Sequence, residues 1–260
     1  GRGRGARAMR RGALAGAAAL SLTLLVAGIF HVYSDHRERA AMDAQQRLKP
    51  PLPTPDATTA ETEAAETEAG EAPPAMDFAG LRAQNGEIVA WLTVDGTAID
   101  YPVAQAVDNE YYLTHTVERQ PSQRGAIFLD FRNTPDLSDF NNILYGHDMR
   151  DGGMFGGLGR FKNTAYFDQH RTGTLFTPGQ TFRLEVFAVV VTPATSGYFR
   201  YAFASPSERE AYVDSIRADA ALWRDLALDP ETDRLVMLST CSYEFEDART
   251  AVFARLAPTP

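Results

Sequence analysis

Residues 234–256, RLVMLSTCSYEFEDARTAVFARL, contain two apolar runs on either side of a polar, acidic connection. Residues 234–240 and 250–256 are rich in aliphatic and β-branched side chains and have polar flanks, so each is predicted to be a strand. Cys241, the one cysteine of the chain, follows the first run, and Arg249 opens the second. If the connection returns the chain beside its start, the thiol and the guanidinium lie at the same rim of a sheet.

Further strand-like runs precede this pair. They are residues 88–94, 99–103, 126–131, 142–145 and 182–191. Asp77 is predicted to cap a short helix, and residues 108–115 are predicted to form a helical turn. The sequence SPSE at 205–208 is a capping pattern and predicts a longer helix. Its apolar face would contain residues 212, 216, 220 and 223. Many strands, few helices and no regular alternation of the two favour a mostly-β barrel or an α+β domain.

The amino-terminal part of the chain is predicted to be a membrane anchor. Residues 1–11 carry five arginines and no acid, and residues 12–33 contain no Asp, Glu, Lys or Arg. A run of this length can span a bilayer, and the positive-inside rule then predicts a cytoplasmic basic tail with the rest of the chain extracellular. A cleaved secretory signal is the alternative, although the apolar run is longer than the usual signal core.

Residues 34–76 are predicted to be a disordered, acidic linker rich in Pro and Thr, because residues 48–75 lack aromatic and aliphatic β-branched side chains. Residues 77–257 are then the folded domain, and they are long enough to enclose a sizeable core. The linker supplies much of the net charge of −9. No basic face is evident that would indicate nucleic-acid binding, and a single cysteine excludes an intramolecular disulfide.

The position of Cys241 favours a reactive thiol, because a strand end that opens into a loop is where sites are usually built. A buried, inert thiol is the alternative. A nucleophilic thiol needs a neighbour that favours the thiolate, and histidine is the usual one. His147 follows an apolar strand and a glycine, as Cys241 follows its own strand. His115 and His170 are interpreted as ordinary surface or capping residues, and the remaining two histidines flank the predicted membrane span.

Taken together, these motifs resemble the sortase signature, and more narrowly that of class B sortases. The residues that carry the resemblance are LSTC at 238–241, Arg249 at the start of the last strand, YGHDM at 145–149, IFLDFRN at 127–133 and DNEYYL at 108–113. The match covers about residues 77–256. It implies a closed eight-stranded β-barrel with additional helices at the amino end and before the seventh strand. Met237 replaces the Thr that usually stands there in the family.

The resemblance also implies an activity and its residues. Cys241 would be the nucleophile that attacks the Thr carbonyl of a surface-protein sorting signal, His147 the acid and then the base, and Arg249 the stabiliser of substrate and oxyanion. The groove that holds the sorting peptide would include residues at five further positions: Asn109, Leu113, Tyr198, Ser239 and Thr240. Neither a metal nor another cofactor is implied.

Several functions remain open on the sequence. The resemblance implies transfer to a peptidoglycan cross-bridge amine at the surface of a Gram-positive cell, with a pilus-linking enzyme that uses a protein lysine as the near alternative. A thiol hydrolase would use water instead. The non-enzymatic alternative is a membrane-tethered barrel that binds cell-wall peptides, with Cys241 inert.

Overall fold

The computed structural model describes residues 27–29, 31–52, 76–241 and 247–259, with the backbone alone at Cys241. The chain divides into two compact units, Gly1–Ala41 and Met42–Pro260. In the first unit the described residues are helical. None of the helices in the described part of the chain is both long and apolar enough to cross a membrane. The predicted membrane span at 12–33 lies outside the described residues apart from 27–29 and 31–33.

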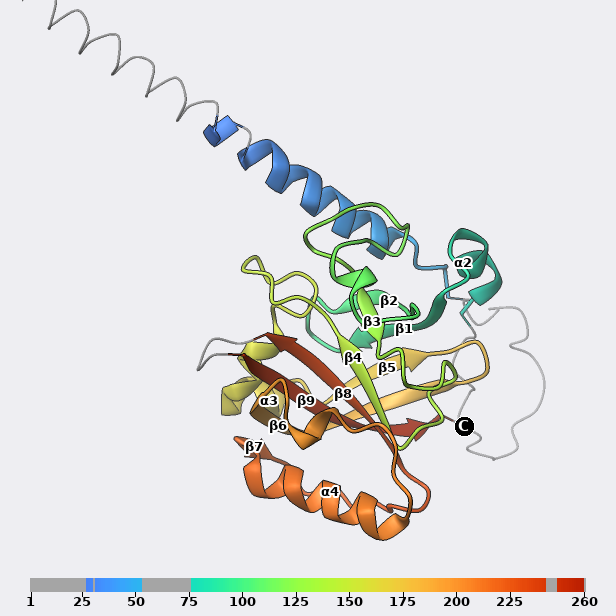
Figure 1. The fold of residues 1–260 in the computed structure, drawn as a ribbon, viewed down its shortest axis with the longest axis vertical. Helices are drawn as coiled ribbons and strands as arrows, with labels where there is room; N and C mark the ends of the chain where they lie inside the picture. Colours follow the sequence, from blue (N-terminus) through green and yellow to red (C-terminus); the bar gives the residue numbers. More distant parts are fainter. Residues whose placement is uncertain (1–26, 30, 53–75, 242–246, 260) are drawn as a thin grey trace, which may run out of the picture. The chain divides into compact units, whose positions relative to one another are not determined.

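The second unit is a β-barrel (Figure 1). Within the described residues, eight strands follow each other around the barrel in the order β5-β1-β2-β3-β4-β8-β9-β6, and β6 pairs with β5 to close it. The strands of the ring are β1 (Ile88–Val94), β2 (Asp100–Ala104), β3 (Ile127–Leu129), β4 (Asn141–Tyr145), β5 (Thr172–Phe176), β6 (Thr181–Pro193), β8 (Arg234–Cys241) and β9 (Ala248–Pro258). The predicted eight-stranded closed barrel is therefore confirmed.

Two pairs of neighbouring strands, β2–β3 and β4–β8, run parallel, and the other neighbours in the ring are antiparallel. A two-residue strand, β7 (Leu222–Trp223), pairs with β6 outside the ring. The helices are α2 (Phe78–Gln84), α3 (Thr164–Gln169) and α4 (Pro206–Asp219), with 3-10 turns η1 (Tyr111–Leu113), η2 (Leu158–Lys162) and η3 (Gly197–Phe199). Helix α2 precedes the first strand and α4 precedes β8, the seventh strand of the ring, as the resemblance implied.

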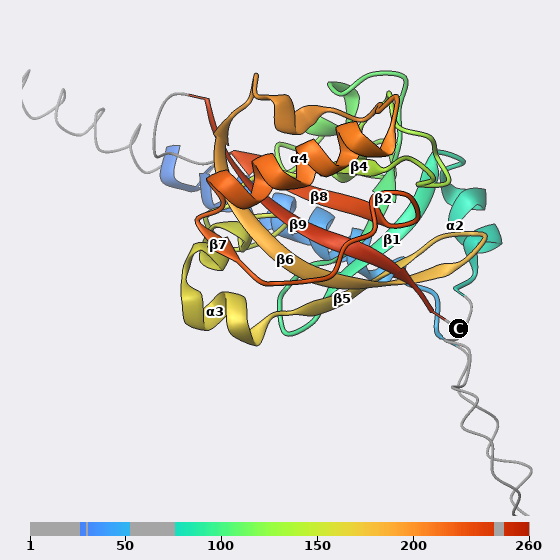
Figure 2. The same ribbon diagram turned by 90° about the horizontal axis from the view of Figure 1, so that it is seen from below.

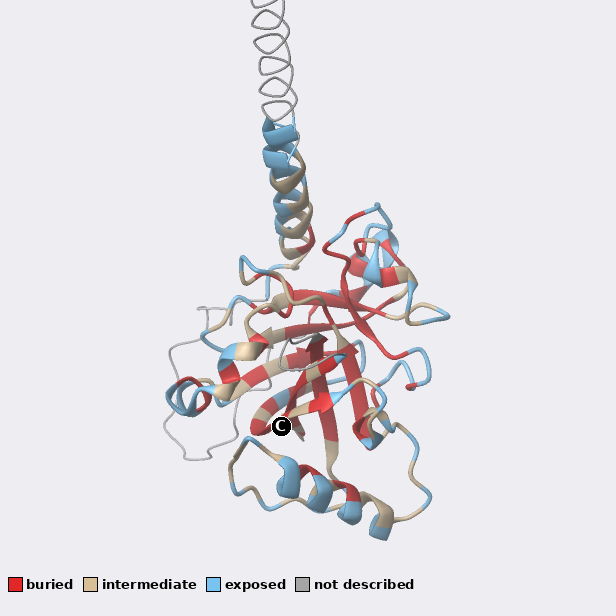
Figure 3. Ribbon diagram, turned by 60° about the vertical axis from the view of Figure 1, so that its left-hand side comes forward, coloured by how far each residue is buried: buried red, intermediate tan, exposed pale blue. Residues whose placement is uncertain are grey.

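The side chains of β8 and β9 alternate between two cores, as the period of two in a strand requires. Val236 and Leu238 belong to a cluster that also contains residues of β1, β2, β4 and β6. Leu235 and Met237 point the other way, into a cluster with Tyr212 and Ile216 of α4. Figure 2 shows α4 lying across β8 and β9, and Figure 3 shows buried strands beside a helix whose outer side is exposed.

Helix α4 begins as predicted but ends earlier. The side chain of Ser205 caps it by accepting a hydrogen bond from the Glu208 amide. The prediction that Trp223 continues its apolar face is wrong, because the helix ends at Asp219 and Trp223 lies in β7. The amide of Ala221 donates to the carbonyl of Val189, 2.8 Å away, so pairing with the edge of β6 replaces the next helical turn.

The folded unit begins well before residue 77, where the sequence placed its boundary. Residues 42–47 are helical, and residues 42–52 belong to the same compact unit as the barrel. Gln45 is only 1% exposed. Its side chain donates to the carbonyl of Gly125 and accepts from the amide of Val117. The linker composition starts only at residue 48. Gln45 therefore lies outside the segment on which the prediction of disorder depended. Residues 53–75 of the predicted linker lie outside the described residues.

Candidate active site

The parallel pairing of β4 with β8 brings two candidate positions to one end of the barrel. Tyr145 is the register partner of Ser239, and the amide of Gly146 donates to the Ser239 carbonyl at 3.2 Å. His147 lies two residues beyond Tyr145, and Cys241 lies two residues beyond Ser239. Positions 147 and 241 are far apart in the sequence, but both therefore lie at the end of the barrel where β4 and β8 end.

The antiparallel hairpin of β8 and β9 brings the third candidate to this rim. Cys241 and Arg249 are register partners, at the last position of β8 and the second position of β9. Direct partners in an antiparallel ladder have Cα atoms about 4.5–5.5 Å apart. The backbone therefore places position 241 opposite Arg249 and beside the strand that leads to His147.

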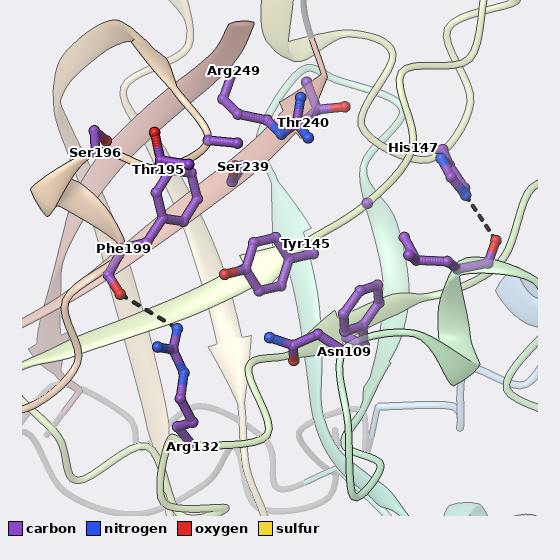
Figure 4. A pocket seen from close by; sticks show the side chains of 14 residues that line it. Asn109, Arg132, Tyr145, His147, Thr195, Ser196, Phe199, Ser239, Thr240 and Arg249 are labelled. Carbon is purple, nitrogen blue, oxygen red and sulfur yellow. Dashed lines mark hydrogen bonds between the residues drawn. The ribbon is translucent and has the colours of Figure 1, made fainter. Parts of the chain in front are cut away.

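A cavity of about 590 Å³ opens at this rim (Figure 4). It is formed by the ends of β4, β8 and β9, by β3, and by the two segments that face them, residues 109–113 and 194–199. Its lining residues are Asn109, Leu113, Phe128, Arg132, Tyr145, Gly146, His147, Ala194, Thr195, Ser196, Phe199, Ser239, Thr240 and Arg249. A cavity of this size, in which apolar side chains alternate with convergent polar and charged groups, is typical of a ligand site.

The imidazole of His147 is partly exposed and contacts the opposite wall. Its Nε2 lies 2.8 Å from the carbonyl oxygen of Leu113 (Figure 4). Because a carbonyl oxygen only accepts, Nε2 carries the proton in this contact. The Phe155 amide donates a hydrogen bond to the carbonyl of His147 at 3.0 Å and so fixes the backbone at this position. The Nε2 proton is therefore directed at the Leu113 carbonyl, and the ring lines the cavity beside it.

Arg249 brings a positive charge to the same end of the cavity. Its Nη1 donates to the carbonyl of Ala248 at 3.0 Å, and no ion pair joins it to a carboxylate in the described part of the chain. A guanidinium has five N–H donors. Most of these donors have no partner among the residues that the structure describes.

An ion pair between Arg132, which lines the cavity, and the buried Asp130 lies at the other end of the cavity. Asp130 accepts from Nε and Nη2 of Arg132 at 2.8 and 2.7 Å, and from the hydroxyl of Tyr145 at 3.0 Å. Burial by itself raises the pKa of Asp130, but the hydrogen bonds from Arg132 and Tyr145 outweigh it and lower the pKa below its ordinary value. Burial and the neighbouring carboxylate raise the pKa of Tyr145. Asp130 is thus an anion and Tyr145 a neutral phenol near neutral pH.

Four of the five predicted groove residues line this cavity: Asn109, Leu113, Ser239 and Thr240. The amide side chain of Asn109 accepts from the Phe131 amide at 3.0 Å. Ser239 and Thr240 are 1% and 3% exposed, and neither hydroxyl has a hydrogen-bond partner among the described residues. Buried polar atoms normally have partners. The Ser239 and Thr240 hydroxyls are therefore buried polar groups at the cavity wall without a partner among the described residues.

The structure does not bring the fifth predicted residue, Tyr198, to this cavity. Its hydroxyl donates to Asp219 at 2.6 Å and also lies 2.9 Å from the carbonyl of Ser215. Burial and the bond to Asp219 raise the pKa of Tyr198 to about 12. Tyr198 lines a separate pocket beside α4, because the period of its 3-10 turn directs the neighbouring Phe199, and not Tyr198, toward the cavity.

Sequence reasoning missed several lining residues. Tyr145 could have been found, since residues i and i+2 of a strand share a face and Tyr145 precedes His147 by two. Arg132 follows a strand end, as His147 does, but surface arginines are too common for that signal to decide. Thr195 and Ser196 lie in an irregular segment between β6 and η3, where no sequence period applies. In the residues that the structure describes, no three His, Cys, Asp or Glu side chains gather as metal ligands would.

Comparisons with known proteins agree with this site. A family model described as the Sortase domain matches residues 92–257. Sortase B of Listeria monocytogenes is 30% identical over 247 residues, which are 91% of this chain and 95% of the relative. A crystal structure from Bacillus anthracis, of a protein similar to sortase B, has a TM-score of 0.71 at 31% identity and covers 86% of this chain and 98% of that one.

The Staphylococcus aureus sortase B–substrate complex has a TM-score of 0.66 at 29% identity, over 70% of this chain and 85% of that chain. The residues that the family model matches include every residue that lines the cavity. The likeness therefore covers the site as well as the barrel.

Proposed function

Because this chain belongs to the sortase family, and within it to class B, it is a cysteine transpeptidase, and we propose that it joins surface proteins to the cell wall. Its donor substrate is a carboxy-terminal sorting signal, which it cleaves after Thr. Its acceptor is a cross-bridge amine of peptidoglycan. The observation that carries the proposal is the convergence of position 241, His147 and Arg249 on one rim of the barrel, beside a cavity large enough for a short peptide.

The proposed reaction has two acyl transfers. The thiolate of Cys241 attacks the Thr carbonyl carbon, and a C–S bond forms. The C–N bond then breaks as His147 gives its proton to the leaving amine. In the second step an acceptor amine attacks the thioester, His147 takes the proton from its nitrogen, and the thiolate leaves. Arg249 stabilises the negative charge that develops on the carbonyl oxygen in both steps.

The cavity supports a peptide as the donor. One end carries His147 and Arg249, and the other carries the Asp130–Arg132–Tyr145 cluster (Figure 4). Ser239 and Thr240 lie beside Arg249, and Tyr145 lies between that end and Arg132, so an extended peptide can run along this wall (Figure 4). The related Staphylococcus aureus sortase B forms a complex with its substrate, and we propose that a sorting peptide occupies the corresponding groove here.

We also propose that the enzyme is anchored in the membrane of a Gram-positive cell, with its amino terminus in the cytoplasm and its barrel outside. The support is the basic residues 1–11 followed by the uncharged residues 12–33. An anchor would hold the barrel near membrane-bound substrates and raise their effective concentration.

The test uses the full chain in detergent micelles. It is incubated with a library of pentapeptide sorting signals together with triglycine, with Nα-acetyl-lysine amide, or without an added amine, and the products are identified by mass. A triglycine adduct of the fragment ending in Thr supports the proposal. Preference for the lysine amine would indicate pilus linking, and free acid in all three mixtures a hydrolase. Cys241→Ala is the control and should give no product. Turnover by that variant would remove the nucleophile assignment.

A further inference from the structure

We infer that residues 42–49 position the proton-donating histidine of the site. This inference rests on the proposed function for the role of His147, but the contacts that carry it are independent of the substrate. The segment contacts both loops that hold the His147 ring: residues 113–125, which supply the carbonyl that receives its proton, and residues 147–155, which carry its backbone. The match to the family model begins only at residue 92, and none of residues 42–49 lines the cavity.

The first route runs through Gln45. Its side chain is buried and spans the 113–125 loop, with Oε1 accepting from the Val117 amide and Nε2 donating to the Gly125 carbonyl. Gly125 has a φ of +59°, and a Cβ there would overlap the carbonyl of Tyr112 and lie 2.9 Å from that of Leu113. The backbone at Gly125 is therefore packed directly on the peptide group whose oxygen receives the His147 proton.

The second route runs through Arg124. Its side chain is 3% exposed, and Nη1 and Nη2 donate to the two carboxylate oxygens of Asp151 at 3.0 and 2.5 Å. The sulfur of Met42 lies 3.8 Å from Nη1, and a side chain at Gly153 would overlap that sulfur. Met42 therefore covers the ion pair and the turn beside it.

The Arg124–Asp151 pair holds the tip of the His147 loop. Asp151 also accepts from the Gly153 amide at 3.2 Å. Inside the loop, the Gly152 amide donates to Met149 and the Phe155 amide to His147, at 2.8 and 3.0 Å. A bidentate arginine–carboxylate pair fixes both distance and orientation, and a covered pair is little screened by salt. Residues 42–49 thus contact both the 147–155 loop and the loop that carries the Leu113 carbonyl.

Loss of these contacts should affect the chemical step more than peptide binding. Most of the cavity lining lies on β3, β4, β8 and β9 and in residues 194–199, outside both loops, so KM should change little. The imidazole would sample more positions, and the fraction of complexes with a proton donor aligned on the leaving amine would fall. Small misplacements of a reacting group have large effects on rate. The expected signature is a lower kcat with KM nearly unchanged.

A matched pair of substitutions in the full chain tests the second route. Asp151→Asn weakens the pair under the His147 loop, and Glu185→Gln weakens the Arg255–Glu185 pair across β6 and β9. Both exchange a carboxylate for an amide at an arginine. We expect kcat to fall about tenfold for Asp151→Asn, with KM within twofold, and both constants to stay within twofold for Glu185→Gln. Equal losses of kcat in the two variants would reduce the Arg124–Asp151 pair to a general stabilising role and overturn this route.

Gln45→Ala tests the first route, and Lys49→Ala is its control. Lys49 belongs to the same segment but pairs with Asp100 of β2, away from both loops. Amide hydrogen exchange is measured at Phe155 and Gly152, whose bonds close the His147 loop, and at Ala126, which donates to Tyr112. We expect at least fivefold faster exchange at Ala126 in Gln45→Ala and at Phe155 in Asp151→Asn, with no change in Lys49→Ala.

The exchange measurement separates this inference from the proposed function. If wild-type chain turns over no sorting peptide but the exchange rates respond as expected, the proposed function fails and the positioning role stands. Unchanged exchange at Phe155, Gly152 and Ala126 in both Gln45→Ala and Asp151→Asn overturns the inference, whatever the turnover.

Discussion

Arg249 and Arg255 lie on the same strand but contact different parts of the molecule. Arg249 lines the cavity, whereas Arg255 donates through Nε to Glu185 at 2.8 Å and lies 3.6 Å from Asp233. Lysine keeps the charge but replaces a planar fork of donors by a point charge. We therefore expect Arg249→Lys to lower kcat/KM at least about 100-fold, as loss of an oxyanion donor does, and Arg255→Lys to leave it within about threefold. Steady-state kinetics on one sorting peptide compares the two, and tolerance of Lys at 249 would make Arg249 only a distant charge.

Asp130 predicts a pH dependence of stability. Its pKa is lowered in the folded state, so the folded state favours the carboxylate more than the unfolded chain does. This contribution is fully present above the ordinary pKa of about 3.9 and is lost as the pH falls through the lowered value. Asp130→Asn should therefore be about 2 kcal/mol less stable than wild type at pH 7, and the difference should shrink below about pH 4. Urea unfolding at pH 7, 5, 4 and 3 measures it, and a constant difference across this range would contradict the assignment.

At the scale of elements, the loop after β4 depends on close backbone contacts. A Cβ at Gly156 would overlap the carbonyl oxygen of Met149 and lie 2.9 Å from its amide nitrogen. At the neighbouring Gly157 a Cβ would have nothing within 4 Å, and the φ of −81° suits any residue. The two glycines therefore form a natural comparison of a packed position with an open one.

We expect Gly156→Ala to destabilise the fold by about 1–3 kcal/mol, the usual range for overpacking, and to lower kcat by displacing the backbone below His147. Gly157→Ala should change neither by more than the error. Thermal unfolding and peptide cleavage are measured on both variants. A Gly156→Ala enzyme with wild-type stability and turnover would show that this loop adjusts freely.

The elements that the sequence predicted are those whose stability is local. Strands β8 and β9 have the expected apolar runs, and Ser205 caps α4 through its own side chain. Strand β5 was missed because it has only five residues and Gly173 weakens its local strand preference. Its pairing with β1 and β6 selects it, and the carbonyl of Thr93 leaves room for no side chain at Gly173. The helical period also wrongly placed Trp223 on α4. Residues 222 and 223 pair with the edge of β6 instead, and this long-range pairing is not visible in the local sequence.

The candidate site also combines features that the local sequence specifies with features that depend on long-range strand pairing. The placement of Cys241 opposite Arg249 needs only a hairpin, which the local sequence specifies. The approach of His147 needs the parallel pairing of β4 with β8, which joins segments distant in sequence and which no local pattern encodes. The resemblance to sortases supplied that information. It did not supply the position of Tyr198, whose hydroxyl is bound to Asp219, or the contribution of Arg132.

At the scale of the whole molecule, the boundary of the folded unit predicts the effect of truncation. Residues 42–52 belong to the compact unit of the barrel, whereas residues 1–41 form another. Deletion of residues 1–41 should leave kcat on a soluble peptide and the Tm of the barrel unchanged. Deletion of residues 1–52 should lower the Tm by several degrees and kcat about tenfold or more, because Gln45 and Met42 are lost. Calorimetry and peptide cleavage on the two truncated chains measure this, and equal behaviour would place the boundary after residue 52.

The ladder of β8 and β9 is paired up to Cys241 and Arg249, so the two strands reach the rim in fixed register. The stretch that joins them can therefore be exchanged as a module, with its length and composition varied while the ladder keeps both backbone positions. Replacing it with the corresponding stretch of a relative should leave the pairing of position 241 with Arg249 and the barrel unchanged. The hairpin thus offers a site at which the sequence of the connection can be varied by design while the two strands keep their register.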